Sequence, residues 1–420
     1  MLIRDVAVEG HGRVDVRVGA DGRIAELGPR LTGPADLDGH GAALLPGLHD
    51  HHVHLTALAA AAASVQVGPA EVRGRAGLAA ALGAGEPGQW VRAVGYHESV
   101  AGALDRRVLD AIVLDRPVRV QHRSGAMWFL NSAALRAVGL DDTPEFHDGR
   151  LWREDARLRR LVPPVRLDLA GLGRRAALLG VTGFTNADPH PAPGLAQTLA
   201  VLPQRVAVMG VDAPVKIMLD DPSLPTPPDL AATVAAARPR PVAVHCVTRV
   251  QLLVTLLALE EAGPVAGDRI EHGALIPAET IPWLRRLGVT VVTQPHFPVE
   301  RGREYATDVR PDDRPHLYRC RSLAEAGIPV AAGTDAPYGT PDPWAVMRAA
   351  VTRDDGEAVT PEAALRLFLG TPERPARARR LSVGAVADLC LLHVPPREAL
   401  HTLTADLVRA AYVGGREITS

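Results

Sequence analysis

The chain contains a single lysine, Lys216, which is a candidate for chemistry. The other 45 of its 46 lysine and arginine residues are arginines, so guanidinium groups serve every ordinary cationic role. A guanidinium stays protonated, whereas an amine that is removed from water can lose its proton and act as a nucleophile. A compositional preference for arginine would also leave one lysine by chance. The sequence around Lys216 therefore has to decide between these interpretations.

Histidines with a metal-binding spacing occur in the segment PGLHDHHVH, where His52 and His54 lie two residues apart. Side chains two apart in an extended chain point to the same side, so both imidazoles can bind one metal ion. This spacing alone is a weak signal, because a buried histidine often serves only as a hydrogen-bonding core residue. It becomes stronger because further ligand-type residues end later predicted strands, namely Lys216, His245, His272 and Asp335.

This set of side chains suits zinc or a similar divalent ion with one position open for water. Two ions also fit the set if an anion bridges them. A protonated lysine cannot bridge, but an amine that has captured carbon dioxide is a carbamate with two oxygen donors. Carboxylation of Lys216 by CO₂ would explain why arginine does not occupy this position.

The elements that must position these residues are short buried strands separated by helical segments, which is typical of repeated βα units. Eight such strands predict an α/β fold, a (β/α)₈ TIM-like barrel with catalytic residues at the carboxyl ends of its strands. The predicted strands are Ala43–Leu48, Pro117–His122, Val181–Ala187, Val215–Leu219, Val242–Val247, Arg269–Gly273, Thr290–Gln294 and Val330–Thr334.

Alternating apolar and polar residues near both chain ends predict a small β-sandwich domain from residues 1–45 and 382–420. The barrel is then expected over residues 46–381. The segment at about 85–164 is longer than an ordinary connection between a strand and a helix. We interpret it as an insertion over the mouth of the barrel.

Composition limits the partners of the protein. A net charge of −2 and a pI near 6.8 give no basic field for nucleic acid or for an anionic membrane. The sequence shows no signal-peptide core and no membrane span, which predicts a cytoplasmic protein that acts on a small molecule. The three cysteines are scattered and indicate neither a disulfide framework nor a cysteine zinc site.

The chain resembles the amidohydrolase superfamily, and in detail its YtcJ-like branch of amidohydrolase family 3. The motifs that carry the resemblance are PGLHDHHVH, GYHES, DRPVRVQHRSG, NSAAL, VKIMLDD, VAVH, RIEHG, QPHF and GTDAP. The sequence departs from the branch at Ala126, which follows Gly125 where members usually have histidine. This departure affects the expected substrate and leaves the expected metal ligands intact.

The resemblance implies two divalent metal ions, with zinc as the first choice, and it also allows a homodimer. His52, His54 and Asp335 would hold the more buried ion, His245 and His272 the other, and carboxylated Lys216 would bridge them. Candidates for substrate binding lie in the predicted insertion or near strand ends: Tyr96, His97, Glu98, His122, Asn186, Gln294, His296 and Tyr338. Each of these eight residues could equally serve an ordinary structural role.

The predicted reaction is hydrolysis of a C–N bond in an amide or cyclic amide that is not a peptide. A metal-bridging hydroxide would attack the carbonyl, and Asp335 would pass a proton to the departing nitrogen. A zinc deaminase of the same superfamily is an alternative, but it needs a glutamate shortly after the fifth-strand histidine, where this chain has Cys246-Val247-Thr248. A lactone or phosphoester hydrolase would share all six ligands. A catalytically inactive barrel protein would be expected to lose ligands, and none is lost here.

Overall fold

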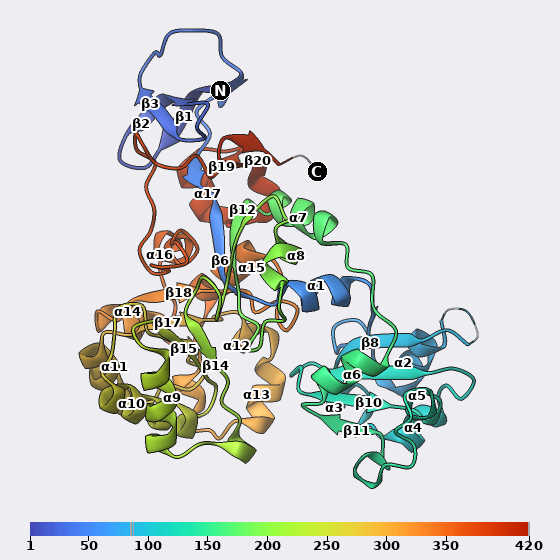
Figure 1. The fold of residues 1–420 in the computed structure, drawn as a ribbon. Helices are drawn as coiled ribbons and strands as arrows, with labels where there is room; N and C mark the ends of the chain where they lie inside the picture. Colours follow the sequence, from blue (N-terminus) through green and yellow to red (C-terminus); the bar gives the residue numbers. More distant parts are fainter. Residues whose placement is uncertain (85, 87, 419–420) are drawn as a thin grey trace. The chain divides into compact units, whose positions relative to one another are not determined.

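The computed structural model describes residues 1–84, 86 and 88–418, which form two units (Figure 1). Unit 1 comprises Met1–His54 and Leu169–Ser420, and unit 2 comprises Leu55–Asp168. The predicted insertion falls inside unit 2, and its first residue, at about position 85, lies outside the described residues. Its placement over a barrel mouth stays a prediction. No helix in the described ranges combines the length and the apolar character needed to cross a bilayer.

Two parallel sheets form the centre of unit 1. A three-stranded sheet has the order β13-β12-β6 and a five-stranded sheet has the order β14-β15-β16-β17-β18. The strands are β6 (Leu48–Val53), β12 (Val181–Asn186), β13 (Arg205–Val208), β14 (Val215–Ile217), β15 (Val242–Cys246), β16 (Arg269–His272), β17 (Thr290–Thr293) and β18 (Val330–Ala332).

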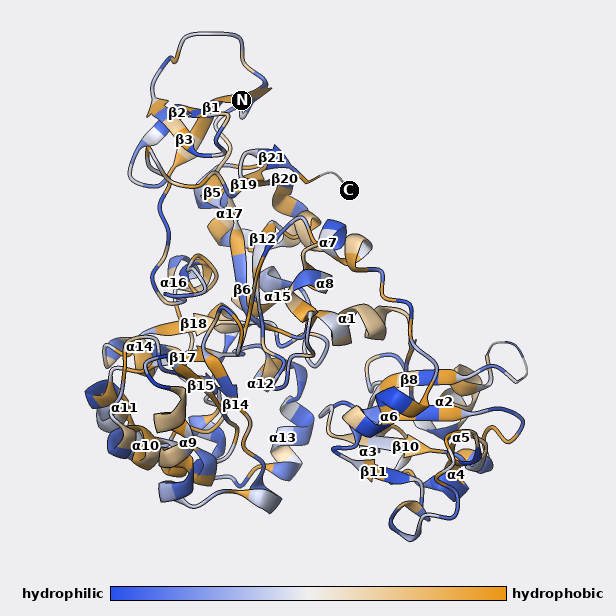
Figure 2. Cartoon of the chain, in the orientation of Figure 1, coloured by the Kyte–Doolittle hydropathy of each residue, from blue (hydrophilic) through white to orange (hydrophobic). Residues whose placement is uncertain are grey.

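Helices follow most of these strands along the chain. They are α7 (Leu169–Leu178), α8 (Leu195–Leu199), α9 (Pro227–Ala237), α10 (Arg249–Ala262), α11 (Ile281–Leu287), α12 (Phe297–Glu300), α13 (Gly302–Asp308), α14 (Arg321–Glu325), α15 (Pro343–Thr352), α16 (Pro361–Arg366) and α17 (Pro396–Thr402). Short 3₁₀ turns are η2 (Asp221–Ser223), η3 (Ala278–Thr280), η4 (Arg314–His316) and η5 (Ala405–Leu407). Figure 2 shows hydrophobic residues on the strands and both polar and hydrophobic residues on α10 and α11, as expected for helices with one buried face.

Backbone contacts link the two parallel sheets at both ends. The Asp335 and His54 N–H groups donate to His52 and Ala336 carbonyls at 2.8 and 2.9 Å, joining β6 to the chain after β18. An isolated parallel bridge between Met209 and Ala213 joins the chain after β13 to the chain before β14. The strand ladders stay two separate sheets, so closure of the barrel stays a prediction.

Two strand predictions were wrong. Pro117–His122 coincides with β9 (Val118–His122), which belongs to a sheet of unit 2, and β13 supplies the unit 1 strand that was not predicted. An apolar run shows that a strand is buried but not which sheet contains it. Ala43–Leu48 is two elements, because the chain leaves one sheet and enters another at Gly47. A Cβ on Gly47 would lie 2.2 Å from the Thr182 side chain, so this crossing requires glycine.

The chain ends form two further sheets in unit 1, ordered β3-β2-β1-β4 and β21-β20-β19-β5. Their strands are β1 (Leu2–Val8), β2 (Gly12–Val18), β3 (Ile24–Gly28), β4 (Leu37–Asp38), β5 (Leu44–Pro46), β19 (Leu389–Leu392), β20 (Val408–Val413) and β21 (Arg416–Glu417). One hydrophobic cluster draws on both sheets, with Val16 from β2 and Leu389 from β19. Pairing of the two chain ends into one core agrees with the prediction, and the sandwich geometry itself stays a prediction.

Unit 2 has its own sheet, ordered β11-β10-β9-β8-β7, and its own core. Besides β9, its strands are β7 (Val65–Gln66), β8 (Val91–Tyr96), β10 (Met127–Leu130) and β11 (Arg150–Trp152). Its helices are α1 (Leu55–Ala62), α2 (Gly74–Gly83), α3 (Glu98–Ala101), α4 (Arg106–Asp110), α5 (Ser132–Ala137) and α6 (Asp155–Leu161), with the 3₁₀ turn η1 (Pro144–Phe146).

Candidate metal centre

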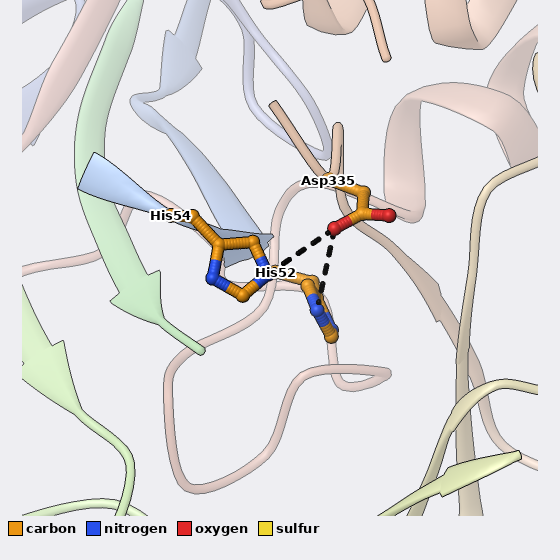
Figure 3. Close-up of side chains that lie close together, drawn as sticks. All are labelled: His52, His54 and Asp335. Carbon is orange, nitrogen blue, oxygen red and sulfur yellow. Dashed lines mark ion pairs between the residues drawn. The ribbon is translucent and has the colours of Figure 1, made fainter. Parts of the chain in front are cut away.

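Three of the predicted ligands meet where β6 and β18 end (Figure 3). His52 Nε2 and His54 Nε2 lie 3.6 and 3.4 Å from Asp335 Oδ1. One ligand atom from each residue lies within 4.8 Å of the others, a spacing that can hold one metal ion. The predicted strand Ala43–Leu48 would have placed His52 after its end. In the structure His52 lies inside β6.

The structure places the other three predicted ligands beside this group, on three consecutive strands. Lys216 lies in β14, His245 in β15 and His272 at the end of β16. The His272 ring centroid lies 4.6 Å from that of His52 and 4.5 Å from that of His245. Lys216 is 7% exposed and interacts electrostatically with all three of these histidines. All six predicted ligands are therefore brought together.

The donor atoms of this cluster fit a divalent metal. Among the described residues, four buried atoms of the cluster have no hydrogen-bond partner: His52 Nε2, Lys216 Nζ, His245 Nδ1 and Asp335 Oδ1. A buried polar atom without a partner costs about 1–3 kcal/mol, so such atoms are rarely gathered in one place. Nitrogen and carboxylate donors that converge in this way are the ligands that zinc and similar ions prefer.

Backbone strain is concentrated at two of the same residues. His272 and Asp335 have φ angles of 66° and 53°, in the left-handed region that residues with a Cβ rarely adopt. Such conformations cost about 1–3 kcal/mol each and cluster at functional sites. The strain therefore accompanies the placement of two predicted ligands at their strand ends.

Electrostatics prepares most of the cluster for metal binding. Burial, followed by the Lys216 charge, lowers the pKa of His52 to about 3, and burial also lowers the pKa values of His245 and His272. These imidazoles are therefore neutral at pH 7 and can donate a lone pair. Burial lowers the pKa of Lys216 as well, which favours the free amine that carboxylation requires.

The two remaining groups carry charge. Burial opposes ionisation of Asp335, but the nearby His54, His272 and His52 imidazoles hold its pKa below the ordinary value. Burial likewise acts against the proton on His54, yet the Asp188 and Asp335 carboxylates raise its pKa to about 9. An ion bound at His54 Nε2 must therefore displace a proton.

His54 and His272 are oriented through Nδ1 by side chains that sequence reasoning did not assign to this role, and His52 is oriented in the same way by Glu271. His54 Nδ1–H donates to Asp188 Oδ1 at 2.8 Å, and His272 Nδ1–H donates to Gln294 Oε1 at 2.9 Å. An imidazole whose Nδ1 is held in this way offers Nε2 to a metal. Gln294 thus contacts a predicted ligand, and its predicted contact with substrate stays a prediction.

Glu271 orients His52. One carboxylate oxygen accepts a hydrogen bond from His52 Nδ1, and the other accepts one from Arg269 Nε. Arg269 Nη2 also donates to the His51 carbonyl at 2.9 Å, and the Glu271 and His52 side chains are both 0% exposed. The alternation in RIEHG, which puts Arg269 and Glu271 on one face of β16, was the available sequence signal.

The remaining predicted substrate contacts of unit 1 lie near the cluster or at the ends of its strands. The Tyr338 ring is edge-on to the His54 ring, with centroids 5.3 Å apart. Asn186 ends β12 and His296 follows β17, and both residues are buried. Their substrate contacts stay predictions.

The predicted substrate contacts of unit 2 have different environments. The Tyr96 hydroxyl donates to the Gly102 carbonyl at 2.5 Å, which gives this residue a structural role. His97, Glu98 and His122 converge on one another within unit 2. Sequence reasoning named these three residues without anticipating that they form a group.

A family model described as Amidohydrolase family matches residues 196–419, more than half of the chain. The chain belongs to the amidohydrolase family. Four of the six predicted ligands lie inside the matched range, namely Lys216, His245, His272 and Asp335. The resemblance expected from the motifs is confirmed at the level of the family, and the YtcJ-like branch stays a prediction.

Solved structures resemble this amidohydrolase over nearly its full length. An uncharacterized metal-dependent hydrolase from Pyrococcus furiosus is 20% identical with a TM-score of 0.72, covering 93% of this chain and 98% of that one. N-isopropylammelide isopropylaminohydrolase from Burkholderia multivorans is 19% identical with a TM-score of 0.54, covering 100% and 97%. A mutant atrazine chlorohydrolase from Arthrobacter aurescens, complexed with zinc and atraton, is 15% identical with a TM-score of 0.59, covering 100% and 95%.

At these identities the likeness concerns the fold, and it confirms the predicted α/β class. No curated protein sequence matches the amidohydrolase.

Proposed function

We propose that this amidohydrolase is a metal-dependent hydrolase that cleaves a non-peptide C–N bond in a small amide or cyclic amide. The observation that carries the proposal is the convergence of six ligand-type side chains, with four buried donor atoms that lack hydrogen-bond partners among the described residues. Family membership and the metal-dependent hydrolase with the same fold support it.

The metal-binding roles follow from the arrangement of the donors. His52, His54 and Asp335 would hold one divalent ion, His245 and His272 a second, and carboxylated Lys216 would bridge them, with zinc as the first choice. When bound, such ions lower the pKa of water and act as Lewis acids toward a carbonyl group.

Lys216 can form the bridge because of its environment. Its buried Nζ has no hydrogen-bond partner among the described residues, and burial lowers its pKa. The lone pair of the neutral amine would attack the carbon of CO₂; an N–C bond would form, one C–O π bond would break to give the carboxylate, and an N–H proton would pass to water. An arginine at this position would stay protonated and could not react in this way.

Asp335 is the proposed proton carrier. Its carboxylate is ionised at neutral pH and faces the cluster, so it can accept the proton of the attacking water. Transfer of that proton to the departing nitrogen would allow an amine to leave. The products would be a carboxylic acid and an amine.

The deaminase alternative has less support. A zinc deaminase uses a glutamate that is not a metal ligand as its acid and base. Glu271 is a buried glutamate close to the cluster, but both of its oxygens already accept hydrogen bonds, from His52 and Arg269. Glu271 is therefore better suited to orienting a ligand than to carrying a substrate proton.

The test combines metal analysis with a panel of N-acyl compounds. Wild-type protein should bind two ions in unit 1, and the Lys216→Arg variant should lose one of them together with nearly all turnover. Arg319→Lys is the control for general damage and should keep both ions, because Arg319 is a buried cation that pairs with Glu357 rather than with a predicted metal ligand. The proposal fails if Lys216→Arg retains both ions and wild-type turnover.

A further inference from the structure

A second group of metal-binding side chains lies in unit 2, at the ends of two adjacent parallel strands. His97 follows β8, Glu98 begins α3 and His122 ends β9. Tyr96 of β8 is paired in register with His122 of the parallel strand β9. His97 is the next residue after Tyr96, so it also lies near His122. Their ring centroids are 5.8 Å apart, and one ligand atom from each of the three residues lies within 4.8 Å of the others.

Both imidazoles are held by the same local turn, in which a serine follows two residues after the histidine. Ser99 Oγ lies 2.9 Å from His97 Nδ1, and Ser124 Oγ lies 2.7 Å from His122 Nδ1. The backbone N–H groups of the two serines also point at these nitrogens, at 3.2 and 3.1 Å. The two turns therefore fix both rings through Nδ1.

The opposite ring nitrogens face one carboxylate. His122 Nε2 and His97 Nε2 lie 3.2 and 3.8 Å from the same oxygen of Glu98, Oε2. Without an ion, the His122 Nε2–H can donate to this oxygen. In that state His122 Nδ1 accepts the Ser124 backbone N–H; with an ion at Nε2, the ring proton moves to Nδ1, and the shorter contact to Ser124 Oγ, which can accept that proton, replaces the backbone contact. The serine hydroxyls thus provide the supporting contacts that metal-binding imidazoles require.

Accessibility also suits an ion that exchanges with solvent. The His97 and His122 side chains are 14% and 19% exposed, while Glu98 is 49% exposed. An ion could therefore enter from the Glu98 side and keep water in its remaining positions.

We propose that His97, Glu98 and His122 bind a divalent first-row transition-metal ion through two imidazole nitrogens and one carboxylate oxygen. This donor set favours zinc, iron or cobalt over calcium or magnesium, which prefer oxygen ligands. In this proposal the three residues are ligands in place of the direct substrate contacts predicted from sequence. The bound ion would fasten the start of α3 to the end of β9. The inference does not depend on the function proposed for unit 1.

The first experiment counts zinc in the full-length protein by mass spectrometry of the metal after dialysis against buffered zinc. Wild type should hold one ion per chain more than His97→Asn or His122→Asn. Glu98→Gln should raise the dissociation constant of this ion at least tenfold, because it removes the charged ligand. The control is His147→Asn, which changes another histidine of unit 2 and should lose no ion.

The second experiment needs no variant and therefore does not depend on the folding of one. Diethyl pyrocarbonate modifies accessible neutral imidazoles, and peptide mass spectrometry measures the modification at each histidine separately. Zinc should slow modification of His97 and His122 at least tenfold and leave His147 unchanged. The site is refuted if zinc protects neither His97 nor His122, or if the His97 and His122 variants hold as much zinc as wild type.

Discussion

Replacing Glu271 with glutamine should weaken metal binding and the fold through two separate effects. The amide has one oxygen where the carboxylate has two, yet His52 Nδ1–H and Arg269 Nε–H both need an acceptor at this position. One of these donors must then face the amide NH₂ group. The substitution also leaves the buried Arg269 guanidinium without its counter-ion, because the Arg269 and Glu271 side chains are 1% and 0% exposed.

The two effects have different magnitudes. Loss of one partner from a buried ion pair costs about 3–5 kcal/mol of folding free energy. Loss of a residue that orients a metal ligand typically costs about 10–100-fold in metal affinity, which is about 1.4–2.7 kcal/mol. The first effect should be visible in chelator-treated protein, and the second should appear as a higher dissociation constant in the folded protein.

Asp188→Asn is the matched comparison. Asp188 accepts from Nδ1 of His54 as Glu271 does from His52, but its side chain is 21% exposed, whereas the Glu271 side chain is 0% exposed. We expect Asp188→Asn to weaken metal binding by a similar factor with a smaller loss of stability. Urea denaturation with chelator measures the stability, and competition with a chelating dye measures the affinity. Unchanged metal affinity in folded Glu271→Gln protein would refute the orienting role.

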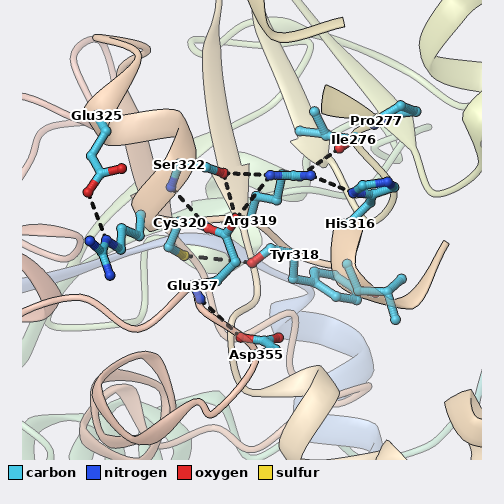
Figure 4. Close-up of polar contacts among 12 residues, drawn as sticks. Ile276, Pro277, His316, Tyr318, Arg319, Cys320, Ser322, Glu325, Asp355 and Glu357 are labelled. Carbon is cyan, nitrogen blue, oxygen red and sulfur yellow. Dashed lines mark hydrogen bonds and ion pairs between the residues drawn. The ribbon is translucent and has the colours of Figure 1, made fainter. Parts of the chain in front are cut away.

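Three further changes have defined outcomes. Asp335→Asn should keep at least one ion in unit 1 but slow hydrolysis by about 10²–10⁴-fold, because the amide cannot accept a proton; wild-type turnover would remove the proton-carrier role. Glu357→Gln should lower the free energy of unfolding by about 3–5 kcal/mol with unchanged metal content, because the Glu357 carboxylate pairs with the buried Arg319 at 3.1 Å and accepts two backbone N–H groups (Figure 4). Burial lowers the pKa of His296 from 6.5 to about 3. Between these two pH values His296 is therefore protonated in the unfolded chain and neutral in the folded chain. The His296 contribution to stability is complete above pH 6.5 and falls by about 1.4 kcal/mol per pH unit below it. Denaturation between pH 7.5 and 5 should show a shallower acid slope for His296→Gln, and equal slopes would contradict this assignment.

The sequence was informative where local pattern and chemistry coincide. Apolar runs located most strands of unit 1, and β15 begins at Val242 as predicted. The same runs could not separate β9 of unit 2 from the strands of unit 1, because a buried strand has a similar composition in either sheet. The short strand β13, whose first two residues are not fully buried, did not give a clear signal.

The candidate site divides in the same way. His52, His54 and Lys216 could be identified because few other residue types perform their chemistry and because their predicted position near the carboxyl ends of strands has a direct geometric meaning. The alternation in RIEHG pairs Glu271 with Arg269, but the contact of Glu271 with His52 could not be identified, since it depends on which face of β16 meets which face of β6, across 219 positions of sequence. That pairing is a tertiary fact and leaves no spacing in the sequence.

The unpaired donors and the left-handed residues of unit 1 have one physical explanation. A folded chain rarely keeps several buried polar atoms without partners, and strained backbone persists only where the surrounding structure holds it. Here both features occur at the same strand ends, and Asp335 shows both of them. Ordinary packing gives no reason for this coincidence, because the hydrogen bonds to Nδ1 of His52, His54 and His272 are complete. The His52 side chain, for example, is satisfied at Nδ1, which orients it, and has no hydrogen-bond partner at Nε2, where the ligands converge. A metal centre accounts for both observations, and it gives the solitary amine of Lys216 a function that none of the arginines could perform.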